Sequence, residues 1–192
     1  LGRDDDVRDV RALIEAHPLV FLDGESGCGK SSLLLFGLLP ELQGDSAKFS
    51  VILSEYSGDW DTGLAVRIFN AAWDALSADG LTLANFADRP AVGGIDAATV
   101  LALFDSIAEE LGRLPVLILD QFDDYQLTHL ERFLDANQAW ISSTQLIESN
   151  RLWRAISDLM RSGRIRLLVA TRADTALGLH SVQLVDDTGK RG

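Results

Sequence analysis

Short apolar runs alternate along the chain with longer segments in which apolar residues recur every three or four positions. The runs lie at 19–22, 49–53, 115–120 and 164–170, with a weaker one at 181–185. A continuous apolar run of this length is typical of a strand buried on both faces. The sequence therefore predicts five strands.

The intervening segments have the spacing of amphipathic helices. They are residues 4–16, 30–39, 64–76, 100–111, and two or three pieces within 128–160. We expect the second helix to end near Pro40, because proline has no N–H and its ring clashes with the preceding turn. Strands that alternate with helices predict an α/β fold, in which helices cover both faces of a parallel sheet.

Composition and charge narrow the class of protein. The chain has 192 residues, 47% of them hydrophobic and 24% charged, which suits one soluble globular domain. Its net charge of -12 argues against a nucleic-acid partner, because phosphate backbones require clustered positive charge. No apolar run reaches the roughly 18 residues of a membrane span. The single cysteine, Cys28, excludes an internal disulfide, so we expect a cytoplasmic protein.

The segment GESGCGKS, residues 24–31, matches the pattern G-x-x-x-x-G-K-[ST] between the first strand and a helix. Glycines let backbone N–H groups converge on phosphate oxygens, and the helix N-terminus adds its dipole. We expect Lys30 to reach the outer phosphates, Ser31 to coordinate Mg²⁺, and Ser32 to lie near the inner phosphate. The predicted cofactor-binding residues here are Gly24, Glu25, Ser26, Gly27, Cys28, Gly29, Lys30, Ser31 and Ser32.

The third strand ends in Asp120, at the edge of an open parallel sheet where ligands bind. Its carboxylate is predicted to hold Mg²⁺ directly or through water. Many ATP-hydrolysing proteins have a glutamate next, which polarises the attacking water, but this chain has Gln121. Asp123 or Asp124 could act from one turn further on, or the two acids could form a solvated loop. General-base chemistry alone does not separate these possibilities.

Two other segments follow strands at the same edge. Thr171 and Arg172 follow the fourth strand, and a position between the other two strands would bring them near the terminal phosphate, which arginine binds well. The alternative is a surface arginine paired with Asp174. Residues 54–60 follow the second strand and either contact a partner or cap the sheet. The candidate catalytic residues are Lys30, Asp120, Asp123, Asp124 and Arg172.

Four segments occur in an order that resembles the STAND class of P-loop ATPases, relatives of the apoptotic, NACHT and plant-resistance ATPases. They are LGRDDDVRDVRALI, LVFLDGESGCGKSSLLLFGLLPEL, VLILDQFDDY and RLLVATRAD, within residues 1–185. The DQFDD element is similar to the DQFEE of prokaryotic members. The resemblance implies a P-loop NTPase three-layer sandwich with the strand order 5-1-4-3-2.

The resemblance also implies roles for individual residues. Arg3 belongs to an entry motif that lines the adenine and ribose side, and Asp4 replaces the usual glutamate there. Thr171 and Arg172 match the element that reads the terminal phosphate. Asp123 or Asp124 matches the second acidic position of the family. The implied ligands are ATP or ADP with Mg²⁺.

The function implied by the resemblance is a prokaryotic signalling switch that binds ATP, hydrolyses it slowly and takes part in processes such as antiphage defence. An unidentified activating ligand and ATP would promote homo-oligomerisation of the full-length protein. We expect residues 1–192 to be the nucleotide-binding core of a longer protein, without its lid, winged helix, effector and sensor repeats. Two alternatives stay open: another P-loop enzyme, such as a small-molecule kinase with an arginine-rich lid, and a non-hydrolysing scaffold.

Overall fold

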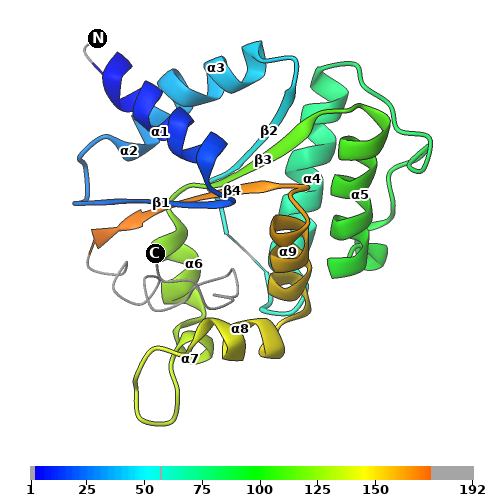
Figure 1. The fold of residues 1–192 in the computed structure, drawn as a ribbon. Helices are drawn as coiled ribbons and strands as arrows, with labels where there is room; N and C mark the ends of the chain where they lie inside the picture. The colour runs from blue at the N-terminus through cyan, green and yellow to red at the C-terminus, as the bar shows by residue number, and fades with distance from the viewer. Residues whose placement is uncertain (1–2, 57, 174–192) are drawn as a thin grey trace.

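Four strands form one parallel sheet in the order β1-β4-β3-β2 (Figure 1). The computed structural model describes residues 3–56 and 58–173. The strands are β1 (Leu19–Gly24), β2 (Lys48–Leu53), β3 (Leu114–Leu119) and β4 (Arg166–Arg172). This order confirms the prediction for the first four strands. The strand predicted at 181–185 lies outside the described residues.

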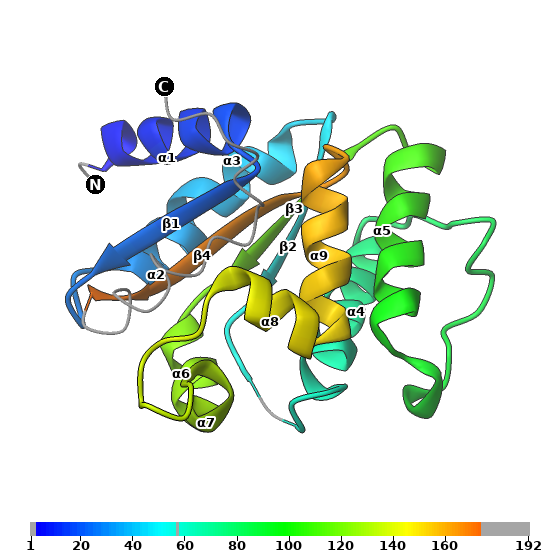
Figure 2. The same ribbon diagram turned by 60° about the horizontal axis from the view of Figure 1, so that its bottom comes forward.

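Helices cover both faces of this sheet (Figures 1 and 2). One face carries α1 (Asp4–Ala16), α2 (Lys30–Leu33), the π-helical turn η1 (Leu34–Leu38) and α3 (Leu39–Gly44). The other carries α4 (Gly63–Ala78), α5 (Ala97–Glu110) and α9 (Arg151–Arg161). The remaining helices are η2 (Val92–Gly94), α6 (Phe122–Thr128), α7 (Leu130–Phe133) and α8 (Ser143–Ser149). The result is the expected arrangement of three layers.

Alternate residues of the two central strands enter separate hydrophobic clusters. Val116 and Ile118 of β3 face α1 and the helix after β1, whereas Leu117 and Leu119 face α4, α5 and α9. All four side chains are fully buried. This explains why β3 is a continuous apolar run, because both of its faces are covered. No helix in the described part of the chain has the length and apolar character needed to cross a membrane.

The helix after β1 does not end near Pro40, so that prediction was wrong. It continues through η1 into α3 and ends at Gly44. In the wider π turn the Leu39 N–H donates to the Leu34 carbonyl, five residues back. This turn makes room for the proline ring, and Pro40 then stands in the first turn of α3, where its missing N–H costs little. Phe36, inside η1, is 81% exposed.

The segment predicted to be helical at 128–160 differs at its start and in its interior. Its first helix, α6, already begins at Phe122, and residues 134–142 form a loop instead of a helix. In this loop the Asp135 carboxylate accepts hydrogen bonds from the backbone N–H groups of Asn137 and Ala139. Such local side-chain bonds favour a turn over a helix.

Candidate functional site

The carboxyl ends of β1, β3 and β4 meet around a cavity of about 500 Å³, which we name the phosphate cavity. The strand register pairs Gly24 of β1 with Arg172 of β4, and Leu119 of β3 with Val169 of β4. The lining residues are Ser26, Gly27, Gly29, Lys30, Ser31, Ser32, Asp120, Gln121, Asp123, Asp124 and Arg172. The fold therefore joins three segments that are far apart in the sequence.

Residues 24–31, the phosphate loop, form one wall of this cavity. Gly27 and Gly29 have φ values of 78° and 89°, a left-handed conformation that glycine adopts without strain. The Lys30 Nζ donates to the carbonyls of Gly24 (2.8 Å) and Glu25 (3.0 Å). Helix α2 begins at Lys30, so its free N–H groups lie at the cavity. The loop thus concentrates positive charge and N–H donors at one point of an acidic protein.

A second cavity, of about 570 Å³, lies on the other side of the loop. It shares Gly27, Gly29 and Ser32 with the phosphate cavity, and it is also lined by Arg3 and Phe36. The Arg3 guanidinium donates to the carbonyls of Cys28 (2.6 Å) and Gly29 (3.3 Å), which ties the start of α1 to the loop.

Sequence reasoning missed Phe36 in this second cavity. The available signal was the unbroken apolar run at 33–36, which is wider than one buried helix face.

Residues 120–125, the acid wall, form the opposite side of the phosphate cavity. Asp120 is 1% exposed, and its Oδ1 accepts from the Gln121 N–H at 2.9 Å. Its Oδ2 is buried, and no described residue offers it a hydrogen bond. A buried carboxylate oxygen without a partner calls for a ligand. Together with the Ser31 hydroxyl on the same cavity, it fits the oxygen ligands that Mg²⁺ prefers.

Asp123 and Asp124 both line the cavity but differ in burial. Asp123 is 8% exposed, whereas Asp124 is exposed. Burial raises the pKa of Asp123, and the Asp124 charge adds to this, while a backbone hydrogen bond and the charges of Arg172 and Lys30 oppose it. The structure therefore separates two acids that the sequence pattern left equivalent.

Only some of the remaining predicted residues line this cavity. Arg172 lines it, whereas Thr171 is buried in β4 and is not among the lining residues. Gly24, Glu25 and Cys28 belong to the loop but do not line the cavity either. The alternative partner of Arg172, Asp174, lies outside the described residues.

An aromatic cluster supports the acid wall from behind. The Tyr56 hydroxyl donates to the Asp120 carbonyl at 2.7 Å, and its ring meets Phe122 edge-on with centroids 5.9 Å apart. Trp60 is buried and stacks on Tyr125 at 5.9 Å. Tyr56 and Trp60 therefore pack against this edge of the sheet, as expected if the segment after β2 caps it.

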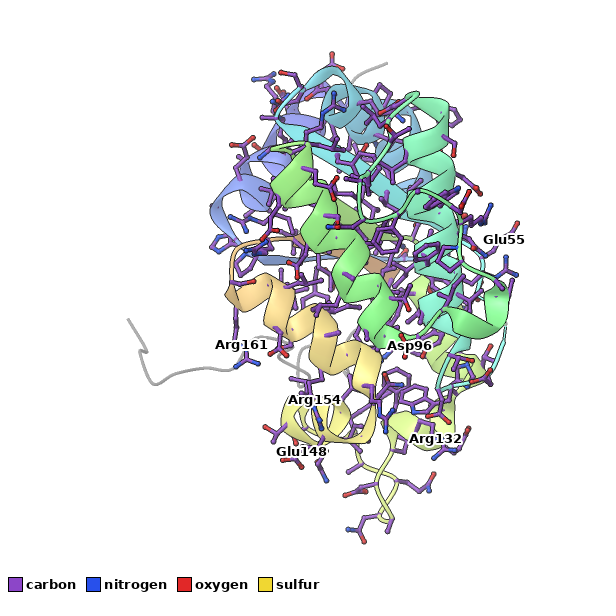
Figure 3. The ribbon with its side chains drawn as sticks, turned by 90° about the vertical axis from the view of Figure 1, so that its right-hand side faces the viewer. Glu55, Asp96, Arg132, Glu148, Arg154 and Arg161 are labelled. Atoms are coloured by element: carbon purple, nitrogen blue, oxygen red, sulfur yellow. The ribbon has the colours of Figure 1, made fainter. Side chains whose placement is uncertain are left out.

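A cavity of about 590 Å³ lies elsewhere, between the N-terminal ends of α4, α5 and α9. Figure 3 labels two of its lining residues, Asp96 and Arg154. Charges of both signs line it, and the Asp96 carboxylate already caps α5 by accepting from the Thr99 N–H. It has no glycine-rich loop, so its chemistry does not match that of the phosphate cavity.

Two solved structures share this fold. The ORC2 protein of Aeropyrum pernix, in its ADPNP–ADP complexes, has a TM-score of 0.56 and 14% identity, covering 96% of this chain and 46% of that chain. Drosophila ORC bound to poly(dA/dT) DNA and Cdc6 has a TM-score of 0.54 and 11% identity, covering 90% and 25%. The chain therefore spans less than half the length of either protein, and these identities show the fold alone.

The sequence itself identifies the family. No curated protein matches it. A family model described as Novel STAND NTPase 1 matches residues 1–188, which confirms the resemblance seen in the four ordered segments. Membership in this family supports nucleotide binding and hydrolysis in general. The chain belongs to the Novel STAND NTPase 1 (nSTAND1) family.

Proposed function

We propose that this domain binds ATP or ADP with Mg²⁺ and hydrolyses ATP slowly, as the nucleotide switch of a longer signalling protein. One observation carries the proposal. The phosphate cavity joins a glycine-rich loop with Lys30 to the buried, unpaired carboxylate oxygen of Asp120. A cradle for phosphates opposite an orphaned acidic oxygen is the arrangement that a metal-bound nucleotide requires.

The phosphate loop would bind the phosphates through its N–H groups. The Lys30 ammonium would exchange the carbonyls of Gly24 and Glu25 for outer phosphate oxygens. Ser31 and Asp120 would hold Mg²⁺, which would neutralise phosphate charge when bound. Arg172, which lines the cavity and pairs with Gly24 in the strand register, would bind the terminal phosphate with a charged, forked donor.

We assign the base and ribose to the second cavity. It shares part of the phosphate loop with the phosphate cavity, so one nucleotide can extend through both. The exposed ring of Phe36 offers a flat apolar surface to a base, since aromatic faces stack on bases of any sequence. Arg3 would hold the loop between the two cavities by its hydrogen bonds to Cys28 and Gly29.

Asp123 is the proposed general base. It lines the phosphate cavity, and its burial raises its pKa toward the range in which a carboxylate accepts a proton more readily. Asp124 also lines the cavity but is exposed to solvent, and its charge contributes to the raised pKa of Asp123. We therefore propose Asp124 as a supporting acid.

The small-molecule kinase has less support. Such an enzyme would need several arginines to close over a second substrate. Among the described residues, Arg172 is the one arginine that lines the phosphate cavity.

In the longer protein, we propose that ATP favours an open state that forms homo-oligomers, and that hydrolysis resets it. This requires the two states to differ in their affinity for ATP and ADP. An activating ligand, a cytoplasmic location and a role in antiphage defence belong to the same proposal. Unchanged oligomeric state of the full-length protein on addition of ATP would contradict it.

The first experiment is to denature the purified protein and identify any released nucleotide by chromatography, with Lys30→Ala as the control. ADP that is released from the wild type and lost in the variant would support a switch that rests with ADP bound. For protein that releases nothing, calorimetric titration with Mg-ATP follows. Failure to bind Mg-ATP would reject the proposed function.

A further inference from the structure

The backbone of Gln121 is left-handed, with φ 53° and ψ 41°. It is one of two non-glycine residues with positive φ in the described part of the chain. An L-residue with a long side chain is disfavoured in this conformation, whereas glycine adopts it freely. Backbone strain of this kind is concentrated at functional sites, where the surrounding structure enforces it.

Three hydrogen bonds enforce the conformation of Gln121. The Tyr56 hydroxyl donates to the Asp120 carbonyl at 2.7 Å, which fixes the peptide group before Gln121. The Gln121 N–H donates to Asp120 Oδ1 at 2.9 Å, and the Gln121 carbonyl accepts from the Asp124 N–H at 3.0 Å. Burial and the nearby acidic charges raise the pKa of Tyr56, so its hydroxyl stays protonated as a donor.

Gln121 lines the phosphate cavity together with Asp120 and Asp123. It is exposed, and no hydrogen bond to its amide is formed within the described residues. A glutamine amide carries one acceptor oxygen and two N–H donors, so it can hold a water and a phosphate oxygen together. A neutral amide does not take the proton itself.

We infer that Gln121 is a catalytic residue whose amide orients the attacking water in the phosphate cavity. This inference rests on the proposed hydrolysis of ATP. The water oxygen forms a bond to the terminal phosphorus while the bond from phosphorus to the bridging oxygen breaks. ADP leaves with that electron pair, and the water proton passes to the Asp123 carboxylate, which releases it to solvent. Orientation and proton acceptance are thus divided between two residues, as general principles of phosphoryl transfer permit.

The competing interpretation is that Gln121 only fills the turn. The two interpretations differ for Gln121→Gly, because glycine relieves the left-handed backbone but removes the amide. We expect this variant of the full-length protein to melt at or above the wild-type temperature and to bind Mg-ATP within about two-fold of wild type. Its single-turnover hydrolysis should fall by roughly 100-fold, the size of a lost positioning interaction at a reacting water.

Gln121→Glu is the rescue variant, because a carboxylate in the same place can also hold the water. We expect it to keep hydrolysis within about ten-fold of wild type. Hydrolysis by Gln121→Gly at the wild-type rate would overturn the inference and leave the proposed function intact. A wild-type protein that binds Mg-ATP but never hydrolyses it, with its activator present, would instead reject the proposed hydrolysis together with this inference.

Discussion

The phosphate loop and the acid wall face each other across one cavity but are held in shape by different means. No residue of the loop is buried, its left-handed residues are glycines, and the Lys30 ammonium donates to the loop's own carbonyls. The acid wall is mostly buried, and its left-handed residue is Gln121. Its conformation depends on Tyr56, which is 64 positions away from Asp120 in the sequence.

Because of this difference, we expect nucleotide affinity and protein stability to depend on different residues. A loop whose shape comes from its own residues can change its side chains without disturbing the core. A wall that rests on a buried aromatic cluster transmits any change into the core. Substitutions in the loop should therefore affect nucleotide affinity, and substitutions behind the acid wall should affect the free energy of unfolding.

The largest effect is expected for Phe122→Ala, behind the acid wall. Phe122 is 1% exposed and packs edge-on against Tyr56, Phe133 and Trp153. Loss of its ring should lower the free energy of unfolding by about 3–5 kcal/mol, through lost burial and the cavity left behind. Urea denaturation measures this. The matched control is Phe36→Ala, which removes an exposed ring and should change stability by less than about 0.5 kcal/mol.

The next largest effect is expected for Lys30→Ala in the loop. It concerns the free energy of nucleotide binding and not the free energy of unfolding. The affinity for Mg-ATP should fall by about 100-fold, or about 2.7 kcal/mol, because a charged donor to phosphate is removed. The melting temperature should stay close to that of the wild type. Isothermal calorimetry and thermal melting test the two halves of this expectation.

Lys48→Ala is the control for that experiment, because Lys48 lies at the start of β2 and forms an ion pair with Glu15. It should leave Mg-ATP affinity unchanged. Equal loss of affinity in the two lysine variants would mean that general charge, and not the loop, binds the nucleotide.

The next prediction tests whether the nucleotide base binds in the second cavity, beside the phosphate loop. Phe36→Ala should weaken ATP binding by about ten-fold, the size of one lost stacking contact. It should leave the binding of inorganic tripolyphosphate unchanged, because that probe has phosphates but no base. Equal weakening of both probes would contradict the assignment of the base to Phe36, whereas Lys30→Ala should weaken both.

The smallest expected effect concerns the pH dependence of the acid wall. The pKa of Asp123 is raised in the folded state, so the folded protein binds this proton more tightly than the unfolded chain. The free energy of unfolding should therefore fall as pH rises from the ordinary aspartate value of ~3.9 through the raised value. Asp123→Asn should remove this fall, with a change under about 1 kcal/mol.

Denaturation at several pH values measures that contribution. Asp124→Asn retains the Asp123 carboxylate but removes one of the charges that raise its pKa, so this variant should keep the wild-type trend at a reduced size. The rate of hydrolysis should rise over the same pH interval as Asp123 ionises, and Asp123→Asn should abolish that rise. Identical pH profiles of rate in wild type and Asp123→Asn would exclude Asp123 as the base.

Sequence patterns alone determined the α/β class, the first four strands, the phosphate loop, and the position of Asp120 at a strand end. These features are local: two-sided burial requires continuous apolar runs, and a phosphate loop needs glycines at fixed spacing. The family resemblance supplied the strand order, which the four described strands follow.

Only the tertiary structure decided which of two adjacent acids is buried, that Tyr56 holds the Asp120 carbonyl, and that Gln121 faces the phosphate cavity in a strained conformation. It also decided that the helix continues past Pro40 and leaves Phe36 exposed beside the second cavity. The physical reason is common to these features. Burial and hydrogen-bond partners depend on residues distant in the chain, and strain in a turn is tolerated only where such distant contacts enforce it.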